Sequence, residues 1–130
     1  MRFKRSAAIT FGIAAAVSLG FGPQAQASQN SGWVYTSTRS GNVYFDADLN
    51  GQPGIEKVTV CDNKSDGRGI EVHLTRDDAS SVLYLRDPSN DGHCVSLSGN
   101  FYKEESYVRI HVYEYWGNNE ANIGEGSAIA

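Results

Sequence analysis

The sequence predicts an all-β domain: an antiparallel β-sandwich of about seven or eight short strands, crosslinked by one disulfide. Almost every segment after residue 28 either alternates polar and apolar residues or is a short β-branched and aromatic run. Clusters of Gly, Pro, Asn and Asp separate these segments about every ten residues, which is typical of sandwiches and barrels. No stretch of the domain shows a sustained helical period.

The strands are expected at residues 33–38, 42–45, 55–61, 69–75, 81–85, 93–97 and 107–115, with a less regular eighth from residue 123 to the C-terminus. The best helix candidate is a single turn near residues 77–80. Because side chains alternate across a strand, Ile70, Val72 and Leu74 should share one face and Glu71 and His73 the other.

The N-terminus has the organisation of a secretory signal peptide. Basic residues at positions 2, 4 and 5 precede an uncharged, mainly apolar run over 7–21, and the small residues Ala25 and Ala27 follow. The run has about 15 residues, fewer than the roughly 20 that span a bilayer as a helix. We therefore expect a signal peptide over 1–27, cleaved after Ala27, and a single secreted domain over 28–130 that is free of the membrane.

The charge of the domain argues against nucleic acid as a partner. Three of the eleven Lys and Arg residues lie within 1–27, whereas all fifteen Asp and Glu residues lie after it, so residues 28–130 carry a formal charge of −7. An acidic domain of this size repels phosphate backbones. Its length suits one monomeric domain with a modest core that benefits from a crosslink.

Cys61 and Cys94 are expected to form that crosslink. They are the only two cysteines, and an exported chain meets an oxidising compartment that favours their pairing. Their isolated spacing does not suit a zinc site. Both cysteines fall on the polar phase of their predicted strands, which favours a bridge across the outer face or rim of a sheet over one through the core.

Three segments share the form Asp-x-x-x-(Asn/Asp)-Gly: residues 46–51, 62–67 and 87–92. We interpret them as one turn device, in which Asp or Asn accepts backbone N–H bonds and Gly takes a positive φ. The first copy places Asp46, Asp48 and Asn50 as an EF-hand calcium loop would. Its twelfth position holds Lys57, where such a loop needs a bidentate Glu, so plain turns are favoured and a looser calcium site stays open.

Catalytic motifs are absent from the sequence. There is no G-x-S-x-G elbow, no H-E-x-x-H pair, and no cysteine left once the disulfide forms. Glu104 and Glu105 are adjacent and would point apart in an extended segment, so they cannot act as the paired acid and base of a glycosidase. We expect neither an enzyme nor a cofactor.

One predicted strand offers a candidate binding surface. Opposite the apolar face of 107–115, the sequence places a row of aromatic and polar side chains, with a tryptophan next to it: Tyr107, Arg109, His111, Tyr113, Tyr115 and Trp116. Such rings can stack on sugars or anchor a protein. The alternative, which the strand preference of tyrosine favours, is that cross-strand neighbours cover them.

Further features resemble a group of small exported one-disulfide proteins of actinobacteria. They are Val60-Cys61-Asp62, the turn Asp66-Gly67, Asp91-Gly92 followed by Cys94, and the Gly-rich end over 124–130. The resemblance implies a small secreted β-sandwich, and it brings no activity and no functional residues with it.

The sequence therefore favours a secreted binding or interaction module, whose partner is an extracellular protein or a polysaccharide. The alternative is a carbohydrate-binding module with an aromatic strip and a structural calcium ion. A small secreted hydrolase comes third, since it would require a pocket that joins a histidine to a buried carboxylate.

Overall fold

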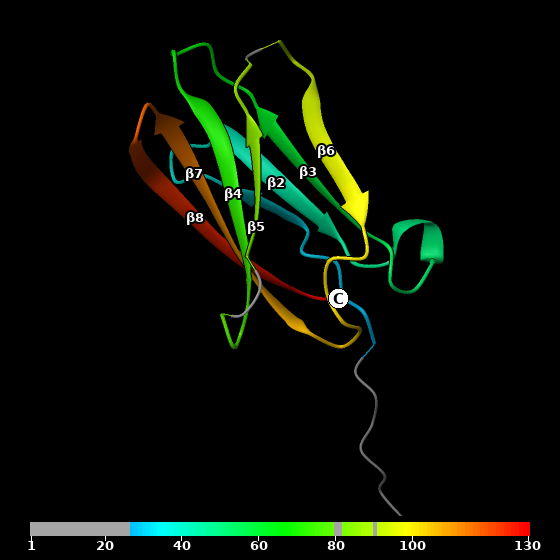
Figure 1. The fold of residues 1–130 in the computed structure, drawn as a ribbon. Coiled ribbons are helices and arrows are strands. Elements are labelled where there is room, and N and C mark those ends of the chain that lie inside the picture. Colours follow the sequence, from blue (N-terminus) through cyan, green and yellow to red (C-terminus); the bar gives the residue numbers. More distant parts are fainter. Residues whose placement is uncertain (1–26, 80–81, 90) are drawn as a thin grey trace, which may run out of the picture.

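The computed structural model describes residues 27–79, 82–89 and 91–130, so the predicted signal peptide lies, except for Ala27, outside the described residues. It shows two antiparallel sheets of four strands each (Figure 1), which confirms the predicted all-β sandwich. The first sheet has the order β1-β2-β3-β6, with β1 (Trp33–Tyr35), β2 (Gly41–Asp46), β3 (Glu56–Asp62) and β6 (Cys94–Gly99).

The second sheet has the order β5-β4-β7-β8. It consists of β4 (Gly69–Arg76), β5 (Val82–Asp87), β7 (Tyr107–Trp116) and β8 (Asn119–Ile129). The eighth strand is thus longer than the sequence suggested. The best helix candidate, near residues 77–80, is not helical over 77–79, which form a turn, and Ser80 lies outside the described residues.

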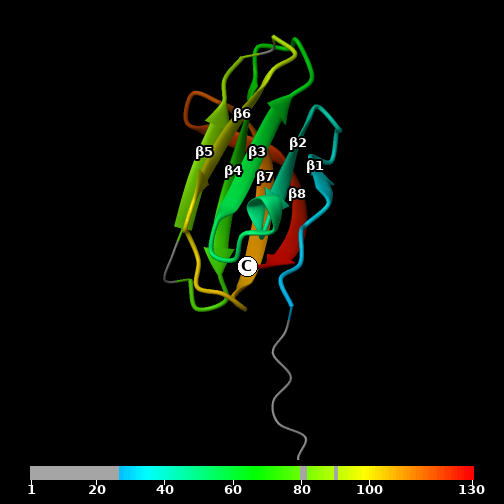
Figure 2. The same ribbon diagram turned by 90° about the vertical axis from the view of Figure 1, so that its right-hand side faces the viewer.

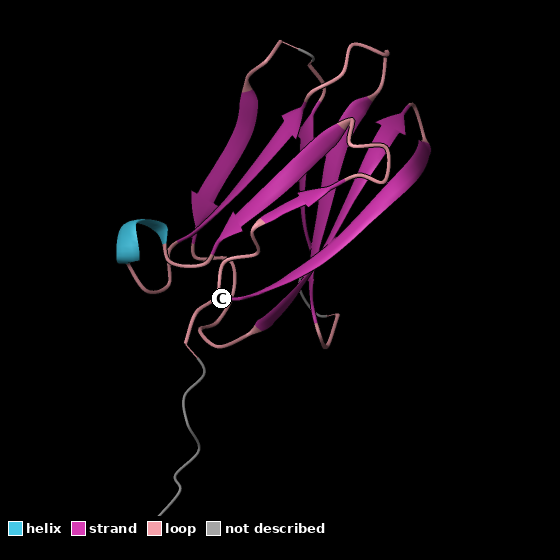
Figure 3. Ribbon diagram, turned by 180° about the vertical axis from the view of Figure 1, so that it is seen from behind, coloured by secondary structure: helices cyan, strands magenta, loops and turns pink. Residues whose placement is uncertain are grey.

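One short 3-10 turn, η1 (Leu49–Gly51), lies between β2 and β3 and projects from the side of the sandwich (Figure 3). Within the described part of the chain, no helix has the length and apolar character needed to cross a bilayer.

The chain changes sheet three times, after β3, β5 and β6, which places β6 beside β3 and β7 beside β4. Figure 2 shows the two edges that result, with β5 and β6 neighbouring each other at one edge and β1 and β8 at the other. Edge strands of both sheets therefore shield one another, which protects their unpaired backbone groups.

The core lies between the sheets and follows the predicted alternation. Val58 and Val60 of β3 face Val72 and Leu74 of β4 and their apolar neighbours on β7, all fully buried. At the β1 edge the sandwich closes tightly on Gly124 of β8, where an added Cβ would lie 1.8 Å from the carbonyl oxygen of Tyr35. The Gly-rich end of the chain thus lets two backbones approach.

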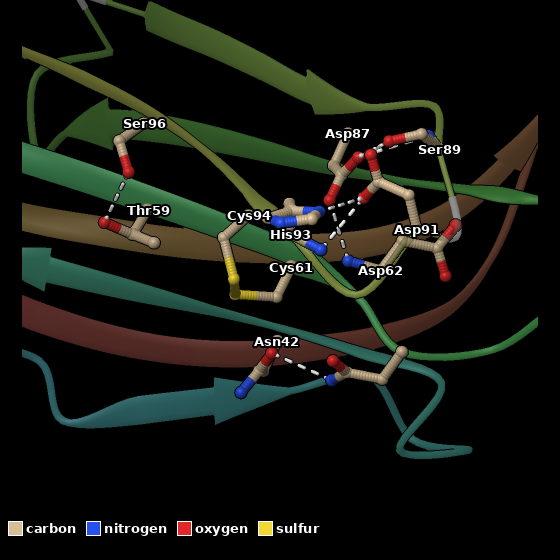
Figure 4. Close-up of a disulfide and its surroundings, with 11 residues drawn as sticks. Asn42, Thr59, Cys61, Asp62, Asp87, Ser89, Asp91, His93, Cys94 and Ser96 are labelled. Carbon is tan, nitrogen blue, oxygen red and sulfur yellow. Dashed lines mark hydrogen bonds and ion pairs between the residues drawn. A yellow bond between two sulfur atoms is a disulfide. The ribbon is translucent and has the colours of Figure 1, made fainter.

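Cys61 and Cys94 form the predicted disulfide, with an S–S distance of 2.02 Å (Figure 4). The two residues are direct cross-strand partners in β3 and β6, with their Cα atoms 4.3 Å apart. Because Cys61 alternates with the inward residues Val58 and Val60, the bridge lies on the outer face of the first sheet, as the polar phase of the cysteines predicted.

The second and third Asp-rich segments form the predicted turn device. The backbone N–H of Lys64 donates to Asp62 Oδ1 over 3.1 Å, and that of Ser89 donates to Asp87 Oδ1 over 3.1 Å. The two loops are also tied together, since the N–H of Asp62 donates to Asp87 Oδ2 over 3.0 Å (Figure 4). The glycines of the second and third copies have φ values of 78° and 76°.

Candidate functional site

The outward side chains of the second sheet form the candidate site, which we call the aromatic face. Strand alternation selects them, because their neighbours in the sequence point into the core. Its members are Glu71 and His73 of β4, Tyr84 and Arg86 of β5, Arg109, His111, Tyr113 and Tyr115 of β7, and Glu120 and Glu125 of β8.

The strand register arranges these side chains in rows across the sheet. His73 pairs with Tyr84 on one side and with His111 on the other. Glu71 pairs with Arg86 and with Tyr113 in the next row. Histidine, tyrosine and opposite charges thus meet on one surface, where directly opposed cross-strand neighbours interact.

His73 is the centre of the face. Its Nε2 contacts Glu71 Oε1 directly and lies 3.4 Å from Glu120 Oε1. The imidazole centroid is 4.4 Å from that of Tyr84, edge to face, and 4.8 Å from that of Tyr113. Only 18 % of the side chain is exposed, so these four neighbours fix the position of the ring.

Glu71 is a buried carboxylate on an outward position, with 2 % of its side chain exposed. Burial alone would raise the pKa of this carboxyl, but the bonds from Arg86 and His73 outweigh it and hold the pKa below its usual value. The carboxylate therefore stays ionised, with Oε2 held by Arg86 and Oε1 turned toward His73.

The face contains two hollows. The larger, of about 580 Å³, is lined by six residues: Glu71, His73, Tyr84, Leu85, Arg86 and Glu120. The smaller, of about 380 Å³, lies along β7 and β8 and is lined by Tyr107, Arg109, His111, Glu125, Gly126 and Ser127. Each hollow combines a tyrosine ring with both acidic and basic side chains that can form hydrogen bonds.

The predicted tyrosine row does face outward, but its members are not equally open. Tyr107 and Trp116, at the two ends of β7, are exposed, whereas Tyr113 and Tyr115 are half-buried. The guanidinium of Arg86 lies 4.5 Å from the ring centroid of Tyr115. Cross-strand neighbours thus cover the middle of the row, as the alternative interpretation held, while its ends stay open.

Sequence reasoning missed the residues that shape the larger hollow. Glu71 and His73 carried a signal, since their spacing of two puts both on the polar face of a predicted strand. Tyr84, Arg86 and Glu120 carried none, because they join the face only through the pairing of β5 and β8, which no local pattern reveals. Tyr84 is 58 % exposed, more than any ring of the predicted row.

The calcium candidates form no comparable cluster. Asp46 and Asp48 are half-buried, Asn50 is exposed with a φ of 58°, and no side chain caps η1. Among the described residues, the one group of three His, Cys, Asp or Glu side chains with converging ligand atoms is on the aromatic face and includes neither aspartate.

A second buried carboxylate, Glu114, anchors one end of the sandwich. It accepts hydrogen bonds from Ser40 over 2.6 Å, from Arg68 over 2.6 Å and from Asn122 over 2.8 Å, and also from Thr38. Burial alone would raise its pKa, but these donors bring the pKa to about 2. Glu114 thus joins β7 to the β1–β2 loop, to the residue before β4 and to β8, and is a structural group.

Comparison with known protein families, with curated proteins and with solved structures returned no match for this chain.

Proposed function

We propose that the protein is a secreted binding module that holds a neutral polysaccharide against the aromatic face. The observation that carries the proposal is the hollow at His73, where the exposed ring of Tyr84 stands beside ionised, well-fixed hydrogen-bonding groups. A sugar ring offers an apolar face to an aromatic side chain and hydroxyl groups around its rim, and this surface provides a partner for both.

The fixed groups suit hydroxyl recognition. Glu71 is held by Arg86 and His73, so its carboxylate has a defined orientation before a ligand arrives. Oriented groups of this kind lose little conformational entropy on binding. Carboxylates accept hydrogen bonds from hydroxyls, and the exposed guanidinium of Arg109 in the neighbouring hollow donates them.

Charge favours a neutral glycan over an acidic one. Three carboxylates, Glu71, Glu120 and Glu125, belong to the face, and residues 28–130 carry a formal charge of −7. An acidic polysaccharide would be repelled from this surface as nucleic acid would.

The distribution of exposed apolar residues favours a polysaccharide over a protein partner. The large ones are Trp33, Tyr84, Leu97, Tyr107, Trp116 and Ile123. In the described part of the chain they are spread over five strands of both sheets, β1, β5, β6, β7 and β8, rather than gathered in one patch. Stable protein interfaces have a contiguous apolar centre.

A hydrolase is the second candidate, since the larger hollow joins His73 to the buried Glu71 carboxylate. This is the arrangement that a base oriented by a carboxylate requires. The six described lining residues include no Ser, Thr or Cys side chain, so a hydrolase would use water or a glutamate carboxylate as its nucleophile. Polysaccharide turnover that disappears in His73→Ala would favour this candidate over binding.

The proposal is tested by depletion of the protein from solution by insoluble neutral polysaccharides: cellulose, chitin, xylan and starch granules. We expect retention on at least one, and we expect Tyr84→Ala to weaken that retention about tenfold through loss of the stacking ring.

Trp33→Ala is the matched control, because Trp33 is also an exposed aromatic residue, 48 % accessible, but lies on β1 of the other sheet. Its retention should equal that of the wild type. Retention on none of the four materials, or equal losses in both variants, would show that the aromatic face is not a glycan site.

A further inference from the structure

Three potential metal ligands converge on the floor of the larger hollow. Glu71 and His73 come from β4, two residues apart on one face of the strand, and Glu120 comes from β8. Their ligand atoms all lie within 4.8 Å of one another. Glu120 is the cross-strand partner of Tyr115 and lies beyond the point where the register between β7 and β8 shifts, between Val112 and Glu114.

The spacing suits a small divalent cation. Zinc binds imidazole nitrogen and carboxylate oxygen at about 2.0–2.2 Å, so two of its tetrahedral ligand atoms lie about 3.3 Å apart. His73 Nε2 and Glu120 Oε1 are already 3.4 Å apart. Glu71 Oε1 contacts the same nitrogen, so a cation would enter between the two in place of their hydrogen bond.

The charges around His73 also favour a bound cation. Glu71 and Glu120 both direct a carboxylate oxygen at the same imidazole nitrogen, and two ionised carboxylates this close repel each other unless a proton or a cation lies between them. Arg86 compensates Glu71 from the far side, through Oε2, and leaves Oε1 directed into the cluster. Arg86 would then act as the outer partner that orients a metal-bound carboxylate.

We propose that Glu71, His73 and Glu120 form a site for a divalent transition-metal cation such as Zn²⁺, with its remaining coordination position open to the hollow. The imidazole ligand selects a borderline cation of this kind over Ca²⁺ and Mg²⁺, which take oxygen ligands. The inference does not rest on the glycan proposal, since it concerns a metal alone and either can fail without the other.

The test is a calorimetric titration of Zn²⁺ into the chelator-treated protein without any glycan. We expect one Zn²⁺ per chain, and no heat of binding with Ca²⁺. His73→Ala and Glu120→Gln should each weaken Zn²⁺ binding at least tenfold. Glu120 is 41 % exposed, so Glu120→Gln is expected to fold. This variant still tests the proposal if His73→Ala fails to fold.

His111→Ala is the matched control. His111 lies on the same face in the adjacent strand, but its Nε2 has one carboxylate nearby, Glu125 at 3.8 Å, instead of two. Its affinity for Zn²⁺ should equal that of the wild type. The proposal is overturned if the wild type binds no Zn²⁺, if Glu120→Gln binds as tightly as the wild type, or if His111→Ala loses binding to the same extent.

Discussion

At the scale of single residues, two buried carboxylates, Glu114 and Glu71, are kept ionised by the hydrogen-bond donors around them. Glu114 has four such donors, and Glu71 is held by Arg86 and His73. An unpaired buried charge would be costly, whereas a fully hydrogen-bonded one ties together the segments that supply its partners. For Glu114 these segments are the β1–β2 loop, the residue before β4 and the start of β8.

This arrangement predicts a stability contribution that depends on pH. The pKa of Glu114 falls from 4.5 to about 2 on folding, so its charged form stabilises the native state fully above pH 4.5. That contribution, on the order of 3 kcal/mol, should disappear as the pH falls from about 4.5 toward 2. Urea unfolding of wild type and Glu114→Gln at pH 7 and at pH 2.5 measures it.

We expect Glu114→Gln to be clearly less stable than the wild type at pH 7 and closer to it at pH 2.5. A stability difference that stays constant between the two pH values would show that the charge of Glu114 makes no such contribution.

At the scale of elements, β7 shows which features of a strand can be predicted from its own sequence. Its alternation correctly predicted that Val108, Ile110 and Val112 face the core and that the tyrosines face outward. The partial cover over Tyr113 and Tyr115 was not predictable, because it comes from His73 and Arg86 on other strands.

The two faces of β7 should differ in mutational cost. Ile110 is fully buried, so Ile110→Ala should lower the free energy of unfolding by about 2–4 kcal/mol through lost transfer energy and a cavity. Tyr113 is half-buried under cross-strand neighbours, so Tyr113→Ala should cost about 1 kcal/mol. Denaturant unfolding of both variants compares them, and losses of equal size would contradict the assignment of an inner and an outer face.

β8 was the least predictable element, and the reason is physical. Its sequence is rich in glycine and lacks a regular alternation, because Gly124 lies where Tyr35 approaches and the register with β7 shifts along its length. Tertiary pairing with β7 makes it a strand of eleven residues. A local pattern cannot report on such pairing.

At the scale of the whole molecule, the sequence predicted the sandwich and the disulfide but not which strands become neighbours. The turns depend on neighbouring residues in the sequence, and two cysteines have only one possible pairing. Both could therefore be predicted from the sequence. The order β5-β4-β7-β8 depends on the three changes of sheet, and it is this order that gathers Tyr84, His73 and Glu120 on one surface. The candidate site is therefore a product of topology.

The central claim is that this surface, and no other, meets the glycan. The most direct measurement is an NMR titration of the folded protein with soluble neutral oligosaccharides derived from cellulose, chitin and xylan. The account predicts chemical-shift changes at outward positions of β4, β5 and β7, centred on His73, Tyr84 and Tyr113. Shift changes confined to β1, β2, β3 and β6, or no change with any of the oligosaccharides, would contradict it.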